Sequence, residues 1–533
     1  MLVGTAVGYG VRCGIAIAIL SPRQRHENHC SAQFGAPRGG AAQTVRGLCA
    51  ERAWTTRVGS SRSGHVRCIL GGMTKRKGAS AVALLTLAGC SGSSVADRGN
   101  PGGDLTIAQS SVARIAASEV SDSDLNAAVA ANNAFGLALY AEVLKTTGDK
   151  NLLTSPISAT LALTMTYAGA QGTTRDEMAA ALHLDPQRGN AIFAGQNALS
   201  QALNGRAAAA LSRLTQQPMQ AGQAAPSPAD YQLQVVNSVW GEQTYTWETP
   251  FLDTLAAHYG TGVYKQDFQR AYEPARARIN DWVSEHTNDK INDLLPKFSV
   301  DSSTRLVLVN AIHLKLPWET SFLPAATAAA NFVRGDASTV STDFMHTVAG
   351  LAYADDGQAQ IVSLPLSNRE LQVVIALPHT DVTLAGYEAS LTAGSSSLTA
   401  AKAGTNVVLS LPKATFTSAS VSLAEALKAL GMKQAFDDQT ANFDGLCASP
   451  PDGGHLHVSD VLQKSMIAMQ ETGIEAAAAT AVLVAGTSSA PAEPPVSVEM
   501  NVNRPYLIAI VDRPTGALLM LGHIQDPTDV GSP

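Results

Sequence analysis

Side chains that could perform catalysis are sparse in this 533-residue sequence. It has no Gly-x-Ser-x-Gly nucleophile turn, no His-Glu-x-x-His motif and no Cys-x-x-Cys pair. His455 and His457 could place two imidazoles on one strand face and bind a metal, although ordinary strand residues show the same spacing. Cys447 is expected to be a buried or loop thiol without a redox role. We therefore expect no enzyme activity, no catalytic residue, no metal site and no cofactor.

Cys90 is the residue for which the sequence predicts a covalent modification. A basic run at 74–77 and an apolar run at 79–88 precede it, and Leu87-Ala-Gly-Cys90 looks like a bacterial lipobox. The apolar run is too short to span a bilayer, so cleavage before Cys90 would leave a thiol that carries acyl chains as the membrane anchor. A chance Leu-Ala-Gly-Cys is the alternative. The pattern predicts an exported, lipid-anchored protein at the outer membrane, at the cell surface or in the extracellular space.

These observations divide the chain into four parts. Residues 1–72 are rich in Arg, Gly and Ser without a sustained period, and we interpret them as a spurious upstream extension before a start at Met73. Residues 73–89 form the predicted lipoprotein signal peptide and residues 90–121 a flexible tether. Residues 122–530 are then expected to form one folded domain.

The charge and cysteine content of this domain exclude some functions. Of the 37 Lys and Arg residues and the 44 Asp and Glu residues, residues 1–89 hold 12 and 2, so the remainder is strongly acidic. An acidic body argues against nucleic acid or a heparin-like polyanion as a partner. Five of the six cysteines lie in the first 90 residues, so the domain has no disulfide framework.

The stretch from Glu471 to Thr480 carries the pattern most relevant to function. Its alanine run would also suit a helix or a low-complexity linker, but Gly473 before the run suits a hinge. Arranged as a strand, the stretch has one small or apolar face and one face with a charge. The first face holds Ile474, Ala476, Ala478 and Thr480, and the second holds Glu475, Ala477 and Ala479. The segment could therefore slide between existing strands with its charge outward.

Other elements must position this stretch. Ser155 and Pro156 start a helix whose residues 159–168 are apolar on nearly every side, so we expect it to be central and buried. Residues 456–470 lead directly into Glu471, and residues 486–491 read as an exposed loop after it. Strands are expected at 231–241, 342–345, 362–366, 373–378 and 407–413, and helices from about 122 and over 423–436.

The stretch 471–480 resembles the reactive-loop hinge of serpins, the serine-protease inhibitors. Further stretches resemble serpin motifs in chain order: 151–184, 275–297, 306–322, Val502-Asn-Arg-Pro-Tyr-Leu507 and 518–527. The resemblance extends from about residue 125 to residue 528. It implies an α+β fold with a large central β-sheet, surrounding helices, further β-sheets and an exposed reactive-centre loop.

The resemblance also assigns a sheet-opening region, which comprises Ser155, Ser158, Asn310, Trp318 and Gln463. Gln463 stands where many serpins carry His, and an amide can likewise donate and accept hydrogen bonds. Trp318 is also expected to pack in the core at the top of the sheet. Ile474 stands where a small Thr or Ser is more usual, but its apolar side chain suits a buried slot.

The function implied by the resemblance is suicide-substrate inhibition. A protease attacks the loop, forms a covalent acyl-enzyme and is trapped when the cleaved loop inserts as a new strand. The reactive bond is expected at Thr487–Ser488, with Leu483, Val484 and Ala485 as alternative bait positions. Because these residues are small or aliphatic, we expect serine proteases with an elastase- or subtilisin-like pocket as targets.

Three further expectations complete this interpretation. Cysteine proteases are a second class of target, and the inhibitor is expected to be a monomer. The alternative function is that of a non-inhibitory serpin acting as a surface binding protein. A hydrolase lipoprotein would need a nucleophile motif that the sequence lacks.

Overall fold

The computed structural model describes residues 105–531 except for 149, 217–226, 368, 392–397, 399–401, 452 and 475–496, together with four short strands nearer the N-terminus. The chain forms two compact units, Met1–Asn100 and Pro101–Pro533. In the first unit, two antiparallel pairs form: β1 (Cys30–Gln33) with β4 (His65–Cys68), and β2 (Gln43–Cys49) with β3 (Arg52–Val58). The predicted signal peptide and Cys90 lie outside the described residues, so their roles stay predictions.

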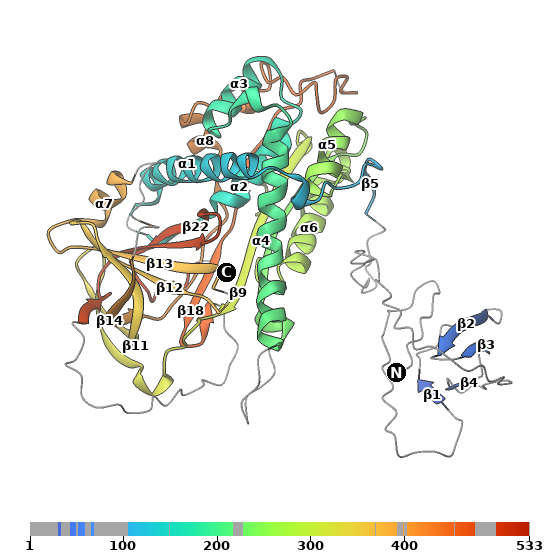
Figure 1. Cartoon of the computed structure of the whole chain (residues 1–533). Helices are drawn as coiled ribbons and strands as arrows, with labels where there is room; N and C mark the ends of the chain where they lie inside the picture. The colour runs from blue at the N-terminus through green and yellow to red at the C-terminus, as the bar shows by residue number, and fades with distance from the viewer. Residues whose placement is uncertain are drawn as a thin grey trace. The chain divides into compact units, whose positions relative to one another are not determined.

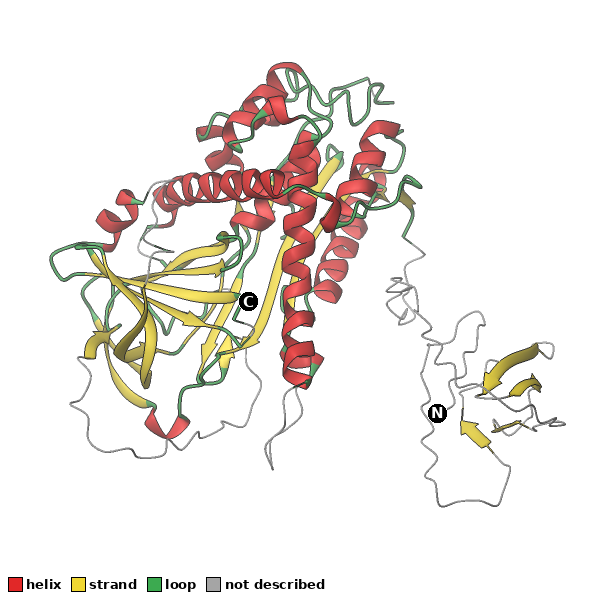
Figure 2. Ribbon diagram, in the orientation of Figure 1, coloured by secondary structure: helices red, strands yellow, loops and turns green. Residues whose placement is uncertain are grey.

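Eight α-helices occur in the described part of the second unit: α1 (Asp122–Thr147), α2 (Pro156–Tyr167), α3 (Gly172–Ala181), α4 (Ala191–Thr215), α5 (Thr249–Tyr259), α6 (Phe268–His286), α7 (Leu384–Ser390) and α8 (Ala424–Ala429). In Figure 2 most of them lie at the top and right of the view, and α7 lies at the left. Every residue of α2 is buried, and Pro156 stands at its first turn after an extended Ser155. This confirms the predicted central helix.

The large sheet that contains the hinge has nine strands. Its long members are β9 (Leu306–Pro317) and β7 (Gln232–Glu242), which pair antiparallel. On one side of this pair lie β8 (Val263–Gln266) and β5 (Ile107–Ala108). On the other side lie β17 (Val461–Gln463), β18 (Met466–Gln470), β19 (Gly473–Ile474), β15 (Ala414–Thr417) and β16 (Val421–Ser422).

A second sheet, also of nine strands, lies on the other side of α2. Its strands, in spatial order, are β20 (Ser497–Asn501), β14 (Lys402–Pro412), β11 (Thr339–Asp355), β12 (Ala359–Pro365), β13 (Leu371–Pro378), β21 (Tyr506–Asp512), β22 (Ala517–Ile524) and β6 (Leu152–Thr154), and β10 (Ala328–Val333) adds to β11. β20 and β14 are parallel, and the other pairs are antiparallel. The expected strands at 362–366 and 373–378 correspond to β12 and β13.

The core joins the two sheets through α2. This helix contacts β22 of the second sheet as well as β7 and β9 of the large sheet (Figure 1). α1 crosses α2 closely at Gly136, where an added Cβ would lie 2.5 Å from Pro156 Cβ. The opposite face of the large sheet is covered by α6, whose Ile279 and Val283 pack in one cluster with Val309. Both faces of the large sheet are therefore apolar, so a strand that enters it finds a buried place.

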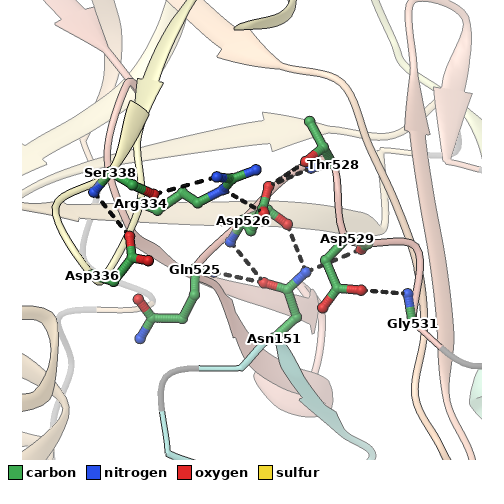
Figure 3. Close-up of polar contacts among 9 residues, drawn as sticks. All are labelled: Asn151, Arg334, Asp336, Ser338, Gln525, Asp526, Thr528, Asp529 and Gly531. Atoms are coloured by element: carbon green, nitrogen blue, oxygen red, sulfur yellow. Dashed lines mark hydrogen bonds and ion pairs between the residues drawn. The ribbon is translucent and has the colours of Figure 1, made fainter. Parts of the chain in front are cut away.

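The C-terminal segment is fixed by a buried amide. The Asn151 Oδ1 atom accepts hydrogen bonds from the backbone N–H groups of Gln525 and Asp526, and its Nδ2 atom donates to the Asp526 and Asp529 carbonyls (Figure 3). Arg334 forms an ion pair of 2.6 Å with the Asp526 carboxylate. The end of the chain is thus bonded to the start of β6 and to the β10–β11 turn.

Residues 105–121 correct the predicted extent of the tether. β5 pairs with β8 at the edge of the large sheet, and the Ile115 N–H group donates to the Ala257 carbonyl of α5. Arg114 donates to the Asn197 side chain of α4 at 2.9 Å. Composition suggested a tether up to residue 121, but these long-range hydrogen bonds hold its last part against the folded body.

A pair of glycine substitutions tests this attachment. A Cβ on Gly262 would lie 2.3 Å from the Ala108 carbonyl oxygen, so Gly262→Ala should displace β5 and destabilise the fold by about 1–3 kcal/mol. Gly205, in α4, has nothing within 4 Å of such a Cβ, so Gly205→Ala should stabilise by about 0.5–1 kcal/mol. Thermal unfolding and amide exchange near residue 107 measure both effects. Equal behaviour of the two variants would show that β5 is not held by β8.

Candidate functional site

The start of the predicted hinge is a strand of the large sheet. Gly473 and Ile474 form β19, which lies between β18 and β9 and runs antiparallel to both. Ile474 pairs with Met469 on one side and Leu316 on the other, and its side chain is 1% exposed. A Cβ on Gly473 would lie 2.4 Å from the Leu316 carbonyl oxygen. Glycine is therefore needed where the chain enters the sheet.

Trp318 holds the backbone just before β19. Its N–H group donates to the Thr472 carbonyl at 3.1 Å, and its indole Nε1 donates to the Gln470 carbonyl at 2.8 Å. The Phe322 N–H group donates to the Glu471 carbonyl at 2.9 Å. Trp318 is 3% exposed, so it packs in the core as expected. Its hydrogen bonds to the hinge backbone had no local signal in the sequence.

The Glu471 carboxylate is held by two residues at strand junctions, Thr327 just before β10 and Lys413 between β14 and β15. Its Oε1 atom accepts hydrogen bonds from Thr327 at 2.9 Å and from Lys413 at 3.3 Å. Burial raises the pKa of this carboxyl, but hydrogen bonds from its own backbone amide, Thr327 and Lys413 outweigh burial and leave the pKa below its usual value. The charged form therefore stabilises the folded state above the usual pKa of Glu, and this contribution is lost as the pH falls through the lowered pKa.

From β19 (the upper end) toward β17 (the lower end), the strand pairing between β9 and β18 is first interrupted and then resumes through β17. On this side, β9 pairs with β19 at residues 316–317 and with β17 at residues 308–310, and among the described residues no strand pairing is recorded between these two points. Further down, β17 pairs parallel with β9, and the last pair is Gln463 with Asn310. Among the described residues, the pairing between β9 and β18 is therefore interrupted from β19 to β17, and we call this interval the gap.

Gln463 fastens the lower end of this gap to α2. Its Oε1 atom accepts from the Ser155 N–H group, and its Nε2 atom donates to the Ser155 carbonyl, both at 2.9 Å. The Ser155 hydroxyl lies 2.9 Å from the Leu519 carbonyl and 3.0 Å from the Ser158 hydroxyl. Gln463, Ser155 and Ser158 are all buried. A single amide thus connects the large sheet to the helix, and Ser155 connects the helix to β22.

Asn310 lies beside this contact without a partner for its side chain. It is 1% exposed, and both its Oδ1 and Nδ2 atoms lack a hydrogen bond to the described residues. A buried, unpaired amide costs about 1–3 kcal/mol. Four of the five predicted sheet-opening residues therefore meet at the lower end of the gap, and Trp318 lies at its upper end.

Comparison with known proteins identifies this architecture. The sequence model described as "Serpin (serine protease inhibitor)" matches residues 130–527. The chain belongs to the serpin family. An uncharacterized serpin-like protein of Thermococcus kodakarensis is 31% identical to this serpin over 402 residues, which cover 75% of this chain and 86% of that protein. Human serpin B4 is 31% identical over 411 residues, which cover 76% of this chain and all of serpin B4.

Solved structures agree with this assignment. The native state of tengpin, a thermophilic serpin, aligns with a TM-score of 0.64 and 25% identity, and the alignment covers 78% of this chain and 97% of tengpin. Maspin aligns with the same TM-score at 21% identity over 76% of this chain and all of maspin, which shows the fold alone. The serpin-like α+β fold expected from the sequence is confirmed.

Several predicted site residues lie outside the part of this serpin that the structure describes. They are Glu475, Ala476, Ala477, Ala478, Ala479, Thr480, Thr487 and Ser488, together with the bait alternatives Leu483, Val484 and Ala485. Their roles stay predictions. The described hinge residues are Glu471, Gly473 and Ile474.

Sequence reasoning missed Lys464, which follows Gln463 in the gap. Lys464 is 4% exposed and donates to the Asn292 carbonyl at 2.8 Å. Burial lowers the pKa of its ammonium group, while Asp293 acts in the opposite direction. The signal in the sequence that could have identified Lys464 was a lysine within a mostly apolar stretch. Lys413 and Thr327 offered none, because they are far from Glu471 in the sequence.

The histidine pair and the remaining cysteine lie away from this gap. His455 and His457 precede β17, so they are not on a strand as expected. The described residues contain no group of three or more His, Cys, Asp or Glu placed to hold a metal. Cys447 is 2% exposed, as expected for a buried thiol.

Removing the Gln463 amide should loosen the lower end of the gap. Gln463→Leu leaves the Ser155 N–H and carbonyl groups unpaired and buried, so we expect a loss of about 2–4 kcal/mol. The thermal midpoint should fall, and the rate of spontaneous loop insertion, followed by protease resistance, should rise. Gln470→Leu is the matched control, because within the described residues the side chain of Gln470 makes just one long hydrogen bond, to Thr415 at 3.5 Å. Similar loss in both variants would contradict a special role for Gln463.

Proposed function

We propose that this serpin is a suicide-substrate inhibitor of serine proteases that traps the acyl-enzyme by loop insertion between β9 and β18. The observation that carries the proposal is β19, because the first residues of the hinge already occupy the place where an inserted strand would begin. Such a strand would continue from β19 through the gap toward β17.

The pairing of β19 gives the register of the proposed inserted strand. Continued along β9, it places Glu475 opposite Lys315 and Thr480 opposite Asn310. Continued along β18, it independently places Thr480 opposite Gln463. Both registers therefore reach the Asn310–Gln463 pair at the same residue. In this register residues 475–479 would lie in the gap, and Thr480 would be the first residue that requires β17 and β9 to separate.

The side chains of the proposed strand fit the two faces it would meet. Ala476 would share the face of Leu314 and Ile467, which are buried in the cluster that contains Ile474. Ala479, on the other face, would lie beside Ala311, which packs in the cluster of α6. Small side chains can pass between the packed side chains of these two clusters without displacing them. The carboxylate of Glu475 would lie on the same face of the sheet as the ammonium group of Lys315. Their opposite charges favour this orientation of the inserted strand.

This register indicates what prevents insertion before cleavage and what favours it afterwards. Before cleavage, the loop is tied at both ends, to β19 and to β20, and it cannot enter the sheet over its full length. After cleavage, each inserted residue gains backbone hydrogen bonds on both sides and buries its side chain. The native state persists because opening the Gln463–Ser155 contact and the β17–β9 pair is slow.

The proposed reaction needs no catalytic group from the serpin. The protease serine attacks a loop carbonyl, the peptide bond breaks, and the new amino terminus leaves with β20. The ester that remains links the protease to the hinge side of the loop. Insertion then moves the protease away from its point of attack before water hydrolyses the ester.

We further propose that the reactive bond is Thr487–Ser488 and that the target has an elastase- or subtilisin-like pocket. The support is the absence of Arg, Lys and aromatic residues from 476–491. Cysteine proteases, which form an analogous thioester, are a second target class. A non-inhibitory surface binding role is the alternative, and it predicts cleavage without a trapped complex.

Incubation with an elastase-like serine protease tests inhibition. The wild-type chain should give an SDS-stable complex, and mass spectrometry of the acyl peptide should locate its end between Leu483 and Ser488. Ala478→Arg places a charge on the inward face and should convert the serpin into a substrate, because a buried unpaired charge opposes insertion. Ala490→Arg, the same change beyond the proposed reactive bond, would leave with β20 instead of entering the sheet and should retain more of the complex.

Two outcomes would oppose the proposal. Clean cleavage of the wild-type chain without complex would support the non-inhibitory alternative. An acyl peptide that ends in Arg or Lys would overturn the proposed specificity.

We also propose that the mature protein is exported and anchored through lipid on Cys90. The support is the basic and apolar run before Leu87-Ala-Gly-Cys90. In a bacterial host, labelled palmitate should enter the wild-type protein and not a Cys90→Ser variant. Equal labelling of both proteins would exclude Cys90 as the anchor.

A further inference from the structure

A groove unrelated to the hinge lies between the N-terminal turns of α1 and α4, with the segment 183–188 as its third wall. Its volume is about 320 Å³, which is within the range of small-molecule sites. α1 and α4 cross closely beside it, since a Cβ on Gly195 would lie 2.3 Å from the Asp124 carbonyl oxygen. This crossing fixes the two helices and so gives the groove a defined width.

Most of the groove is lined by small, apolar side chains. Ala127, Ala131 and Ala134 recur at the spacing of one helix face and line it from α1. Leu184 and Ile192 line the facing walls. A row of small side chains leaves room for an aliphatic chain and offers it no hydrogen bond.

A buried polar group without a partner distinguishes this groove from an ordinary gap between helices. Gln196 of α4 lines it and is 0% exposed, and neither its Oε1 nor its Nε2 atom has a hydrogen bond to the described residues. The Arg188 Nε atom is also buried without a partner. Buried amides are almost always paired, so the Gln196 amide retains a donor and an acceptor with which a ligand head group could pair.

The charges around the groove restrict what that ligand can be. Arg188 forms an ion pair of 2.7 Å with Asp124, so its charge is already balanced. Asp185 adds a further negative charge and caps the Gln187 N–H group. An anion would therefore meet no net positive charge, and a cation would face the unpartnered guanidinium N–H. A neutral head group that both donates and accepts matches the Gln196 amide best.

We propose that this groove binds a small neutral molecule with an aliphatic body and a carboxamide head. The chain lies along the alanine face of α1, and the head pairs with the Gln196 amide. The site is separate from the reactive loop, and its existence does not depend on protease inhibition.

Titration of the full chain with three six-carbon probes, followed by saturation-transfer NMR, tests the proposal. Hexanamide should bind, and hexanoate and hexylammonium should bind at least about 5-fold more weakly, as expected when a paired hydrogen bond is replaced by a mismatched charge. Failure of hexanamide to bind, or equal binding of the three probes, would overturn the proposal.

Matched substitutions locate the binding. Ala130 lines the groove and Ala141 does not, and both are exposed residues of α1. Ala130→Phe should weaken hexanamide binding at least about 10-fold by filling the groove, whereas Ala141→Phe should leave it unchanged. Equal binding by the two variants would place the probe elsewhere.

Gln196→Leu separates recognition from folding. It should abolish the preference for hexanamide over hexanoate and raise the thermal midpoint of the free protein, because it removes an unpaired buried amide. A variant that keeps the preference would exclude Gln196 as the recognition group.

Discussion

The structure depends on one interrupted strand pairing in the large sheet. β9 pairs with β17 over its lower part and with β19 over its upper end, and between them its edge has no registered partner among the described residues. An internal edge of this kind is unusual, because unpaired backbone groups inside a protein cost free energy. It persists here because each end of the gap is held by groups that are themselves fixed elsewhere.

Those fixed groups connect the gap to the rest of the fold. At the upper end, Trp318 and Phe322 bond the carbonyls before β19, and Lys413 and Thr327 hold the Glu471 carboxylate. At the lower end, Gln463 bonds both backbone groups of Ser155, the residue that begins α2. Opening of the large sheet is thereby coupled to α2, which packs against both sheets.

The parts of this arrangement that depend on local pattern could be predicted from the sequence. The apolar surface of residues 159–168 indicated a buried helix, and the alternation from Ile474 onward indicated a segment able to enter a sheet. The resemblance to serpins brought together Ser155, Ser158, Asn310 and Gln463, which lie far apart in the chain.

Features made by distant contacts could not be predicted in this way. β5 is only two residues long, and the composition around it resembles a linker, so its pairing with β8 left no local signal. The role of Trp318 depends on carbonyls about 150 residues away, as its separation from Gln470 shows. Gln196 has no local signal either, because its burial without a hydrogen bond to the described residues depends on the neighbouring helices.

The position of β21 and β22 determines whether the two fragments separate after the loop is cut. Both strands follow the loop in the chain, yet they lie inside the second sheet, between β13 and β6. Asn151 bonds the segment after β22 as well. A cut in the loop therefore yields two polypeptides that stay in one body, so size-exclusion chromatography cannot distinguish the cut protein from the intact one, and only denaturation separates the fragments.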